Sequence, residues 1–336
     1  MAFDLYADSD ATGANNGSSW TDAFASLQDL YDNVSDGDVC GARGTFSGDV
    51  QVDTLEASIG TKVQVVGCNS SGDEDSTTPF TISGGTNGLY ITKRNYTLKH
   101  AIITGASGAG ISGSYAAGVA GCNWNLFNVA LVGNYDGIDV SALSYIIAHR
   151  CDFNENTRYG LVGNGNITLL RSRITHNGSH GMELLSYLVS RGCLYHGNAG
   201  DNIRLNGGIL EYNTIDGADD DGVYYNASSA PLISRFNRIT NNGGYAFNTN
   251  LSVMSVADYL WGNAGGDINV ATALLKDYLT RVAADNVCDG YKNRAAHDFR
   301  VTPGAVGTNI PMPMGDIKEL TNVGFYTAGC LMPERV

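Results

Sequence analysis

Short stretches of alternating apolar and polar residues recur along this chain. In Gly181–Leu184, the side chains of Met182 and Leu184 share one face of an extended segment and Glu183 takes the other, which predicts a β-strand with one buried side. The glycine and the apolar residue after it define a slot that returns every 20 to 27 residues. The nine copies of this slot are Gly88-Leu89, Gly110-Ile111, Gly137-Ile138, Gly160-Leu161, Gly181-Met182, Asn202-Ile203, Gly222-Val223, Ala246-Phe247 and Asp267-Ile268. The spacing predicts a structural repeat of about 22 residues.

Three further columns of residues keep a fixed offset from the slot. Apolar residues stand seven positions before it: Ile103, Ala130, Phe153, Ile174, Tyr195, Ile215, Ile239 and Leu260. Small or amide side chains stand two positions earlier again: Asn128, Cys151, Ser172, Cys193, Asn213 and Asn237. Asparagines stand four positions before the slot: Asn156, Asn177, Asn198, Asn242 and Asn263. Because like residues recur at one phase, we expect a parallel β solenoid whose coils stack about 4.8 Å apart, with ladders of asparagine side chains.

Both ends of the solenoid carry segments with helical spacing. Ser18 and Ser19 are suited to cap a helix from Trp20 to Tyr31, and residues 271–284 predict a second amphipathic helix. We therefore expect an N-terminal strand and helix cap over residues 1–38, a β-helix over 39–270, and a C-terminal capping helix with an irregular tail over 271–336. Such caps would protect the exposed strand edges of a solenoid.

Composition and charge exclude several classes of protein. The 336 residues include 43 glycines but only 6 prolines, which favours a fold rich in turns over collagen or a flexible linker. The net charge is −14, and residues 1–75 carry 14 acidic and 2 basic side chains, a net of −12. An acidic surface disfavours nucleic acid as a partner. No run of 18 apolar residues predicts a membrane span.

Seven cysteines stand at irregular spacing, and no CxxC motif occurs. An odd number without a framework predicts buried free thiols in a protein made in a reducing cytoplasm. The first residues, MAFDLYADSD, have neither a basic nor an apolar stretch, so we expect no secretory leader.

Three segments of the chain resemble parts of a known superfamily. The opening of its proteins is similar to YADSDATGANNGSSWTDAFASLQDLYDNVSDGDVCGARGTFSG. A typical coil is similar to Arg173–Met182, and a closing segment is similar to His297–Gly304. The superfamily is that of the pectate-lyase-like proteins. The resemblance implies a single-stranded, right-handed parallel β-helix. It does not imply one activity, because that superfamily holds polysaccharide lyases, glycoside hydrolases, phage tailspikes and non-catalytic adhesins. The Asn-Thr-Asp motif of its polygalacturonase branch is absent here.

The solenoid hypothesis turns sequence offsets into surface neighbours. Residues just before the slot and two after it point outward, so three successive coils bring six polar and aromatic side chains into one patch. These candidate glycan-binding residues are His180, Glu183, Asp201, Arg204, Asp221 and Tyr224. Aromatic rings stack on sugars, arginine pairs with uronates, and paired carboxylates suit hydrolysis, whereas a lyase would need a base and a cation. A solvated face with surface ion pairs explains the same residues, and no catalytic residue is assigned.

Calcium is the one cofactor that the sequence leaves open. Asp8 and Asp10, with Thr12 and Asn15, are spaced like a calcium loop, although Ser19 stands where a bidentate glutamate belongs. The run Asp219–Asp221 is the dense acidic cluster of the coils, and pectate-lyase-type calcium sites use several aspartates. An ordinary turn explains either segment as well.

Two functions from different classes remain open. The sequence favours a phage virion surface protein of capsid-decoration or tail-spike type, made in the host cytoplasm, whose partners are other virion proteins or glycans and for which a homotrimer is one open assembly. The alternative is a polysaccharide lyase or glycoside hydrolase, secreted or phage-borne, which acts outside the cell on an acidic polysaccharide.

Overall fold

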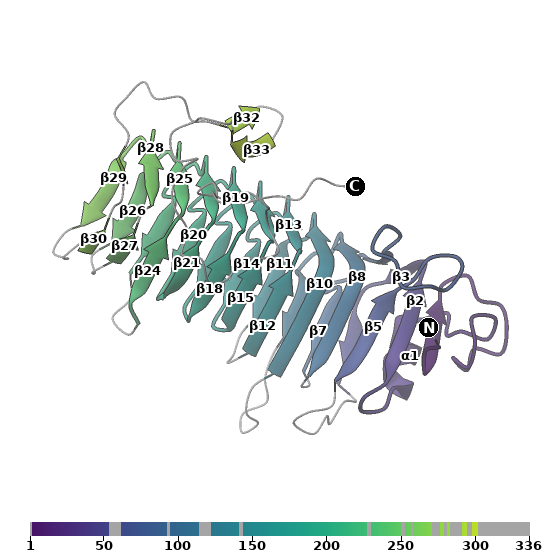
Figure 1. Cartoon of the computed structure of the whole chain (residues 1–336). Coiled ribbons are helices and arrows are strands. Elements are labelled where there is room, and N and C mark those ends of the chain that lie inside the picture. Colours follow the sequence, from purple (N-terminus) through teal and green to yellow (C-terminus); the bar gives the residue numbers. More distant parts are fainter. Residues whose placement is uncertain are drawn as a thin grey trace, which may run out of the picture. The chain divides into compact units, whose positions relative to one another are not determined.

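The computed structural model describes residues 2–301 except 54–61, 93–94, 114–121, 141–143, 227–229, 250–252, 257, 271–275, 279–280, 283–290 and 294–297. The described chain is almost entirely β-structure, and its parallel strands form a solenoid (Figure 1). It divides into two compact units, the first comprising Met1–Thr168 with Glu183–Ser186, and the second Leu169–Met182 with Tyr187–Val336. None of the described helices is long and apolar enough to cross a membrane.

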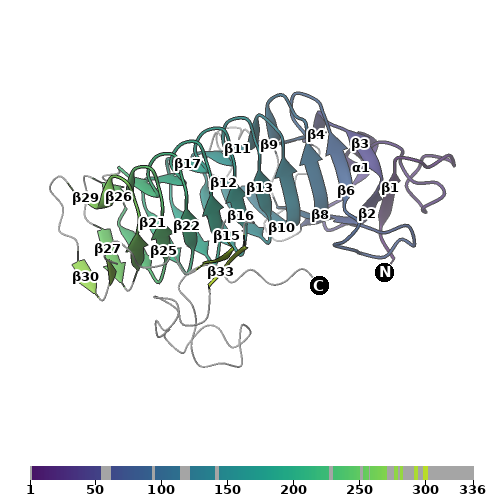
Figure 2. The ribbon, with the colours of Figure 1, turned by 90° about the horizontal axis from the view of Figure 1, so that it is seen from above.

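In the first unit, each coil contributes one strand to each of three parallel ladders, and β8 and β10 are long enough to span two of them. One ladder contains β1 (Leu5–Asp8), β2 (Val39–Arg43), β5 (Val63–Gly67), β8 (Tyr96–Thr104), β10 (Cys122–Val132) and β12 (Ser144–His149). The second contains β3 (Thr45–Ser47), β6 (Phe80–Ser83), β8, β10 and β13 (Asp152–Asn154). The third contains β4 (Val50–Val52), β7 (Leu89–Ile91), β9 (Ala109–Gly113), β11 (Asp136–Val140) and β14 (Leu161–Gly163). Figure 2 shows β9 and β11 as neighbouring coils.

The second unit repeats the same three ladders. One ladder contains β18 (Leu188–Arg191), β21 (Gly208–Glu211), β24 (Leu232–Arg235), β27 (Val253–Val256) and β30 (Lys276–Tyr278). The second contains β16 (Arg173–Thr175), β19 (Leu194–His196), β22 (Thr214–Asp216), β25 (Arg238–Thr240), β28 (Tyr259–Trp261) and β31 (Arg281–Val282). The third contains β20 (Ile203–Leu205), β23 (Val223–Tyr225), β26 (Tyr245–Thr249) and β29 (Gly266–Val270). Strands β15 (Asn166–Leu170) and β17 (Met182–Leu184) cross the boundaries of the units, and β32 (Tyr291–Asn293) pairs antiparallel with β33 (Asp298–Val301). The predicted parallel β solenoid is confirmed.

The apolar column lies in the core of each unit. Its members are fully buried: Ile82, Ile103, Leu131 and Phe153 in the first unit, and Ile174, Tyr195, Ile215, Ile239 and Leu260 in the second. One coil departs from the predicted phase, because Leu131, not Ala130, pairs with Ile103 and Phe153. The same shift moves Asn128 out of the inward column and onto a left-handed corner, where its φ is 51°. Both assignments were wrong by one residue because this coil is one residue shorter between the column and its slot.

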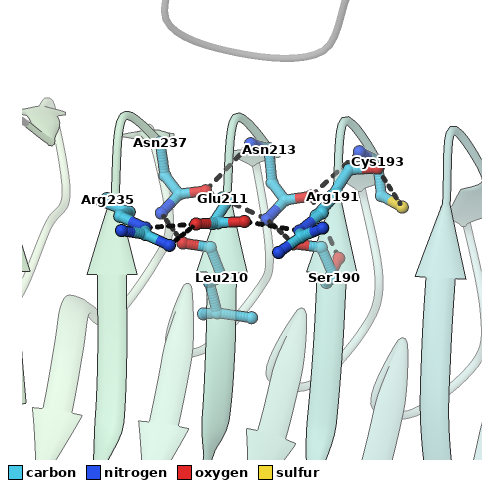
Figure 3. Close-up of polar contacts among 8 residues, drawn as sticks. All are labelled: Ser190, Arg191, Cys193, Leu210, Glu211, Asn213, Arg235 and Asn237. Carbon is cyan, nitrogen blue, oxygen red and sulfur yellow. Dashed lines mark hydrogen bonds and ion pairs between the residues drawn. The ribbon is translucent and has the colours of Figure 1, made fainter. Parts of the chain in front are cut away.

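The predicted asparagine ladders are present inside each unit. In the first, Asn134 Nδ2 donates to Asn156 Oδ1 at 3.3 Å; in the second, Asn177 Nδ2 donates to Asn198 Oδ1 at 2.9 Å. The other amide column joins Asn213 Nδ2 to Asn237 Oδ1 at 3.0 Å, and the backbone N–H of Cys193 to Asn213 Oδ1 at 2.9 Å (Figure 3). These buried bonds satisfy amide groups that would otherwise destabilise the core.

The ladder in Figure 3 runs beside an ion pair that links three coils. Arg191 Nε donates to Glu211 Oε2 at 2.5 Å, and Arg235 donates to Glu211 Oε1. Glu211 is buried whereas both arginine side chains are about half exposed. The shared carboxylate therefore keeps three stacked strands in register.

The N-terminal helix is shorter than the sequence pattern predicted. Helix α1 spans Leu27–Asn33, and its N-cap is Ser26, whose side chain accepts the backbone N–H of Asp29 at 3.1 Å. The predicted start at Trp20 was wrong, because Ser19 Oγ accepts the N–H of Asp22 in a local turn and Trp20 stacks against Arg43 at 4.3 Å. Ala23 and Phe24, which precede Leu27, are buried by loop packing instead of on a helical face.

The second predicted helix, over 271–284, was also wrong where the chain is described. Strands β30 and β31 occupy that segment and pair in parallel with β27 and β28. The backbone groups at the edge of the preceding coil offer hydrogen bonds that a short isolated helix would forgo. The division of the chain at residues 38 and 270 stays a prediction.

Five of the seven cysteines lie in the described part, and four of them are buried free thiols: Cys40, Cys68, Cys151 and Cys193. Burial raises the pKa of Cys40 to about 12 and the pKa values of Cys68 and Cys193 to about 11. At neutral pH the thiols of Cys40, Cys68 and Cys193 are therefore protonated, and they pack as small core residues.

Candidate functional site

Five of the six predicted glycan-binding residues lie together in the second unit. His180 and Asp201 occupy the turns that precede β17 and β20, and Asp221 occupies the turn that precedes β23. Arg204 and Tyr224 are the outward residues of β20 and β23 and stand opposite each other in the register of these strands. We call these five residues the outer-face cluster.

His180 connects two members of the cluster. Its Nδ1 accepts the backbone N–H of Asp201 at 2.8 Å, and its Nε2 lies 3.3 Å from Nη1 of Arg204. Nδ1 of His180 also lies 3.5 Å from Oδ2 of Asp201. Nη1 of Arg204 can only donate, so its contact with Nε2 of His180 orients the guanidinium beside the imidazole ring.

Arg204 is further held by Tyr224. Its guanidinium carbon lies 4.8 Å from the centre of the Tyr224 ring, and both side chains are partly exposed. A planar cation on an aromatic face is kept in a defined orientation while its edge stays open to solvent.

The two aspartates of the cluster are buried and linked to each other. Asp201 Oδ1 accepts the N–H of Asp221 at 3.1 Å. Asp221 in turn accepts the N–H of Tyr245 and the Nδ2 of Asn248, both at 2.6 Å. Burial raises the pKa of Asp201 to about 7, with repulsion from the carboxylates of Asp221 and Asp220 adding to the rise. Burial also raises the pKa of Asp221, against which the bonds from Tyr245 and Asn248 act.

Asp220 completes a group of three carboxylates with Asp201 and Asp221. One oxygen from each lies within 4.8 Å of the others, and Asp220 is exposed whereas its two neighbours are buried. A donor set made only of carboxylate oxygens fits calcium or magnesium, and a cation there would remove the repulsion that raises the pKa of Asp201. Among the described residues, this group is the candidate metal site.

The sixth predicted residue, Glu183, lies on β17 and belongs to the first unit, whereas the other five belong to the second. Sequence reasoning did not select Asp220 or Asn248 as members of the site. Asn248 stands two positions after its slot, as Arg204 and Tyr224 do, so this offset could have identified it from the sequence. Asp220 was visible as part of the triple-aspartate run.

The calcium loop predicted at Asp8 and Asp10 has a different structure. Asp8 is buried, its Oδ2 accepts a hydrogen bond from Arg43 Nε at 2.7 Å, and its Oδ1 accepts the N–H of Asp10 at 3.0 Å. Asn15 Oδ1 is occupied by the N–H of Ala25 at 2.8 Å. A carboxylate already neutralised by arginine and an Asx turn does not fit a calcium site, so the turn interpretation is the one favoured here.

The fold is similar to that of solved polysaccharide-active proteins. A structure described as pectate lyase Pel9A is 14% identical, covers 97% of this chain and 95% of its own, and has a TM-score of 0.71. A GH136 lacto-N-biosidase from Eubacterium ramulus is 11% identical, with 83% and 68% covered and a TM-score of 0.49. The periplasmic alginate epimerase AlgG is 13% identical, with 76% and 82% covered and a TM-score of 0.45. No family model and no curated protein matches the chain.

At such low identity the first of these likenesses shows the fold alone. The chain is a parallel β-helix of the pectate-lyase-like type, which confirms the resemblance seen in its sequence. The structure with a TM-score of 0.71 is described as a pectate lyase, so it lends no support to the hypothesis of a phage surface protein.

Proposed function

We propose that this protein binds an acidic polysaccharide at the outer-face cluster and cleaves it by β-elimination. The observation that carries the proposal is the partly exposed guanidinium of Arg204, which is oriented by His180 at 3.3 Å and by the Tyr224 ring at 4.8 Å. A guanidinium held in a defined orientation can pair with a uronate carboxylate. The adjacent ring offers a face for the apolar side of the sugar.

In elimination from a uronate, a base takes the C5 proton, the C4–O bond breaks, and a C4–C5 double bond forms on one fragment while the leaving oxygen takes up a proton as a hydroxyl of the other. Neutralising the charge of the carboxylate makes the C5–H more acidic, and Arg204 would supply positive charge for that purpose. A divalent cation held by Asp201, Asp220 and Asp221 would supply further positive charge when bound. The similarity to a structure described as a pectate lyase supports this reaction class over hydrolysis.

The test is activity on a panel of polysaccharides, with and without calcium, followed by the ultraviolet absorbance of unsaturated uronate ends and by reducing ends. We expect turnover on a uronate polymer, and a loss of about 100-fold in kcat/KM for Arg204→Ala, as is typical when one charge-stabilising donor is removed. Arg235→Ala is the matched control. It removes a half-exposed arginine of the same unit and leaves Glu211 paired with Arg191.

Reducing ends without unsaturated products would indicate hydrolysis and contradict the proposed reaction. Neither product and no uronate binding would contradict the function as a whole. A non-catalytic protein of a virion surface, with a trimer as one assembly, would then be the hypothesis to pursue, and imaging of particles would test its location.

A further inference from the structure

A second group of polar and aromatic side chains lies in the first unit, on two successive coils. Tyr135 and Asp136 precede the slot of one coil, and Arg158 and Tyr159 precede the slot of the next. The backbone N–H of Arg158 donates to the carbonyl of Tyr135 at 2.7 Å, which places these turns directly against each other. We call these four residues the tyrosine–arginine platform.

Arg158 is held on three sides. Its Nε and Nη2 donate to the two carboxylate oxygens of Asp136 at 2.9 and 2.5 Å. Its guanidinium carbon lies 4.9 Å from the Tyr135 ring and 4.7 Å from the Tyr159 ring. Asp136 is buried, and its Oδ1 also accepts the N–H of Tyr159 at 3.2 Å. The guanidinium is therefore fixed before any ligand arrives, which lowers the entropic cost of binding.

The platform is nevertheless open to solvent. Tyr135 is 41% exposed, and the Arg158 side chain is 39% exposed. The bidentate pair with Asp136 uses Nε and Nη2, so Nη1 lies outside that pair. An exposed aromatic face next to a fixed N–H donor suits a pyranose. The C–H groups of the sugar stack on the ring, and its hydroxyls accept hydrogen bonds from the donor.

The charge of the platform selects against an acidic sugar. Asp136 neutralises Arg158, and Asp139, the outward residue two positions after the slot glycine, adds a further carboxyl. Burial raises the pKa of Asp139, and the Asp136 carboxylate raises it further while Arg158 opposes the rise. Asp136 and Asp139 are thus close enough to interact, and the positive charge here is already matched. A uronate would therefore find the guanidinium of Arg158 already paired with a carboxylate.

We propose that the tyrosine–arginine platform is a second carbohydrate-binding site, which binds a neutral hexopyranose unit of a polysaccharide. The sugar's C–H face lies on the Tyr135 ring, and one of its hydroxyls accepts a hydrogen bond from Nη1 of Arg158. The site does not depend on the cleavage proposed for the second unit.

The test is isothermal titration calorimetry with β-1,4-linked gluco-, manno- and galactohexaose, and with the galacturonate hexamer for comparison. We expect at least one neutral hexaose to bind, Tyr135→Ala to weaken it about tenfold, and Tyr135→Phe to retain it because the ring remains. Arg158→Lys should also weaken binding, since lysine keeps the charge but cannot make the flat bidentate arrangement. Arg204→Ala should leave this binding unchanged while it lowers kcat/KM for uronate cleavage by about 100-fold.

Three results would overturn the proposal. The first is that no neutral hexaose binds at millimolar concentration. The second is that wild type and Tyr135→Ala bind equally well. The third is that the galacturonate hexamer binds more tightly than the neutral hexaoses, in a manner that depends on Tyr135. Sedimentation of wild type and Tyr135→Ala completes the test, because a change of oligomeric state would make this face an interface between copies. Thermal unfolding of each variant separates lost binding from lost structure.

Discussion

At Gly181 and Asn202, the residue in the slot matches the ladder position of the following coil. A Cβ on Gly181 would lie 2.6 Å from the carbonyl oxygen of Asn202 and 2.7 Å from Nδ2 of Asn198, so the next coil leaves no room for a side chain there. Asn202 occupies the next slot, and the coil after it carries Ala218 at the ladder position. The Asn202 side chain fills the missing rung, since it accepts from Asn198 Nδ2 at 2.7 Å and donates to Asn242 Oδ1 at 3.1 Å. At this coil the slot residue therefore supplies the amide that the ladder position lacks.

A double-mutant cycle checks this exchange. Asn202→Gly should lower the free energy of unfolding by about 1–3 kcal/mol, because it removes two buried hydrogen bonds of the ladder, from Asn198 Nδ2 and to Asn242 Oδ1. Ala218→Asn should also destabilise, since Asn202 already occupies the space. The double variant should recover most of the loss because it recreates the arrangement of Gly181 and Asn198. Urea unfolding measures all four proteins, and a double variant as unstable as the sum of the single changes would refute the argument.

Of the elements, the strands follow from the sequence better than the helices do. A strand in this fold needs only alternation and a neighbouring coil, whereas both predicted helices rested on spacing that a loop or a strand also satisfies. Trp20 and Phe24 fit a helical face but are held by Arg43 and by a bridge between Phe24 and Ala7. The wrong assignment of Ala130 to the apolar column has a similar origin. The sequence does not reveal that this coil is one residue shorter until the strands that pair with it are known.

The helix boundary gives a prediction at the scale of an element. Ser26→Ala should destabilise the protein by about 1 kcal/mol, because it removes the side-chain acceptor for the N–H of Asp29 at the helix start. Ser18→Ala, at the boundary predicted from sequence, changes an exposed residue and should have little effect. Thermal unfolding of the two variants tests this, and a larger loss for Ser18→Ala would support the longer helix.

At the scale of the whole molecule, buried aspartates couple stability to pH. Burial raises the pKa of Asp201 to about 7 and that of Asp258 to about 6, both far above the value of an exposed aspartate. Between pH 4 and these values, the folded protein binds more protons than the unfolded chain. The contribution of these groups to stability is therefore complete below about pH 4 and is lost as pH rises through their folded-state pKa.

Asp201→Asn should flatten this dependence. With a chelator present to exclude cations, the wild-type melting temperature should fall more between pH 4.5 and 7.5 than that of the variant. The difference corresponds to at most one proton, or about 1.4 kcal/mol per pH unit. Calcium at pH 7.5 should raise the wild-type melting temperature and have less effect on the variant, because the variant lacks one of the three carboxylates. Equal pH profiles would show that Asp201 is ionised in the folded protein at low pH.

The sequence by itself determined the repeat, the identity of most ladder residues and five members of the outer-face cluster, because a period of about 22 residues converts offsets into neighbours. It could not determine which side chains contact one another or through which atoms. That His180 Nδ1 accepts the Asp201 N–H, that Asp220 joins Asp201 and Asp221, and that two tyrosine rings enclose Arg158 depend on side-chain directions and on backbone bonds between coils. A periodic pattern specifies which positions meet, whereas their charge state and hydrogen bonds follow from burial and orientation, which exist only in the folded chain.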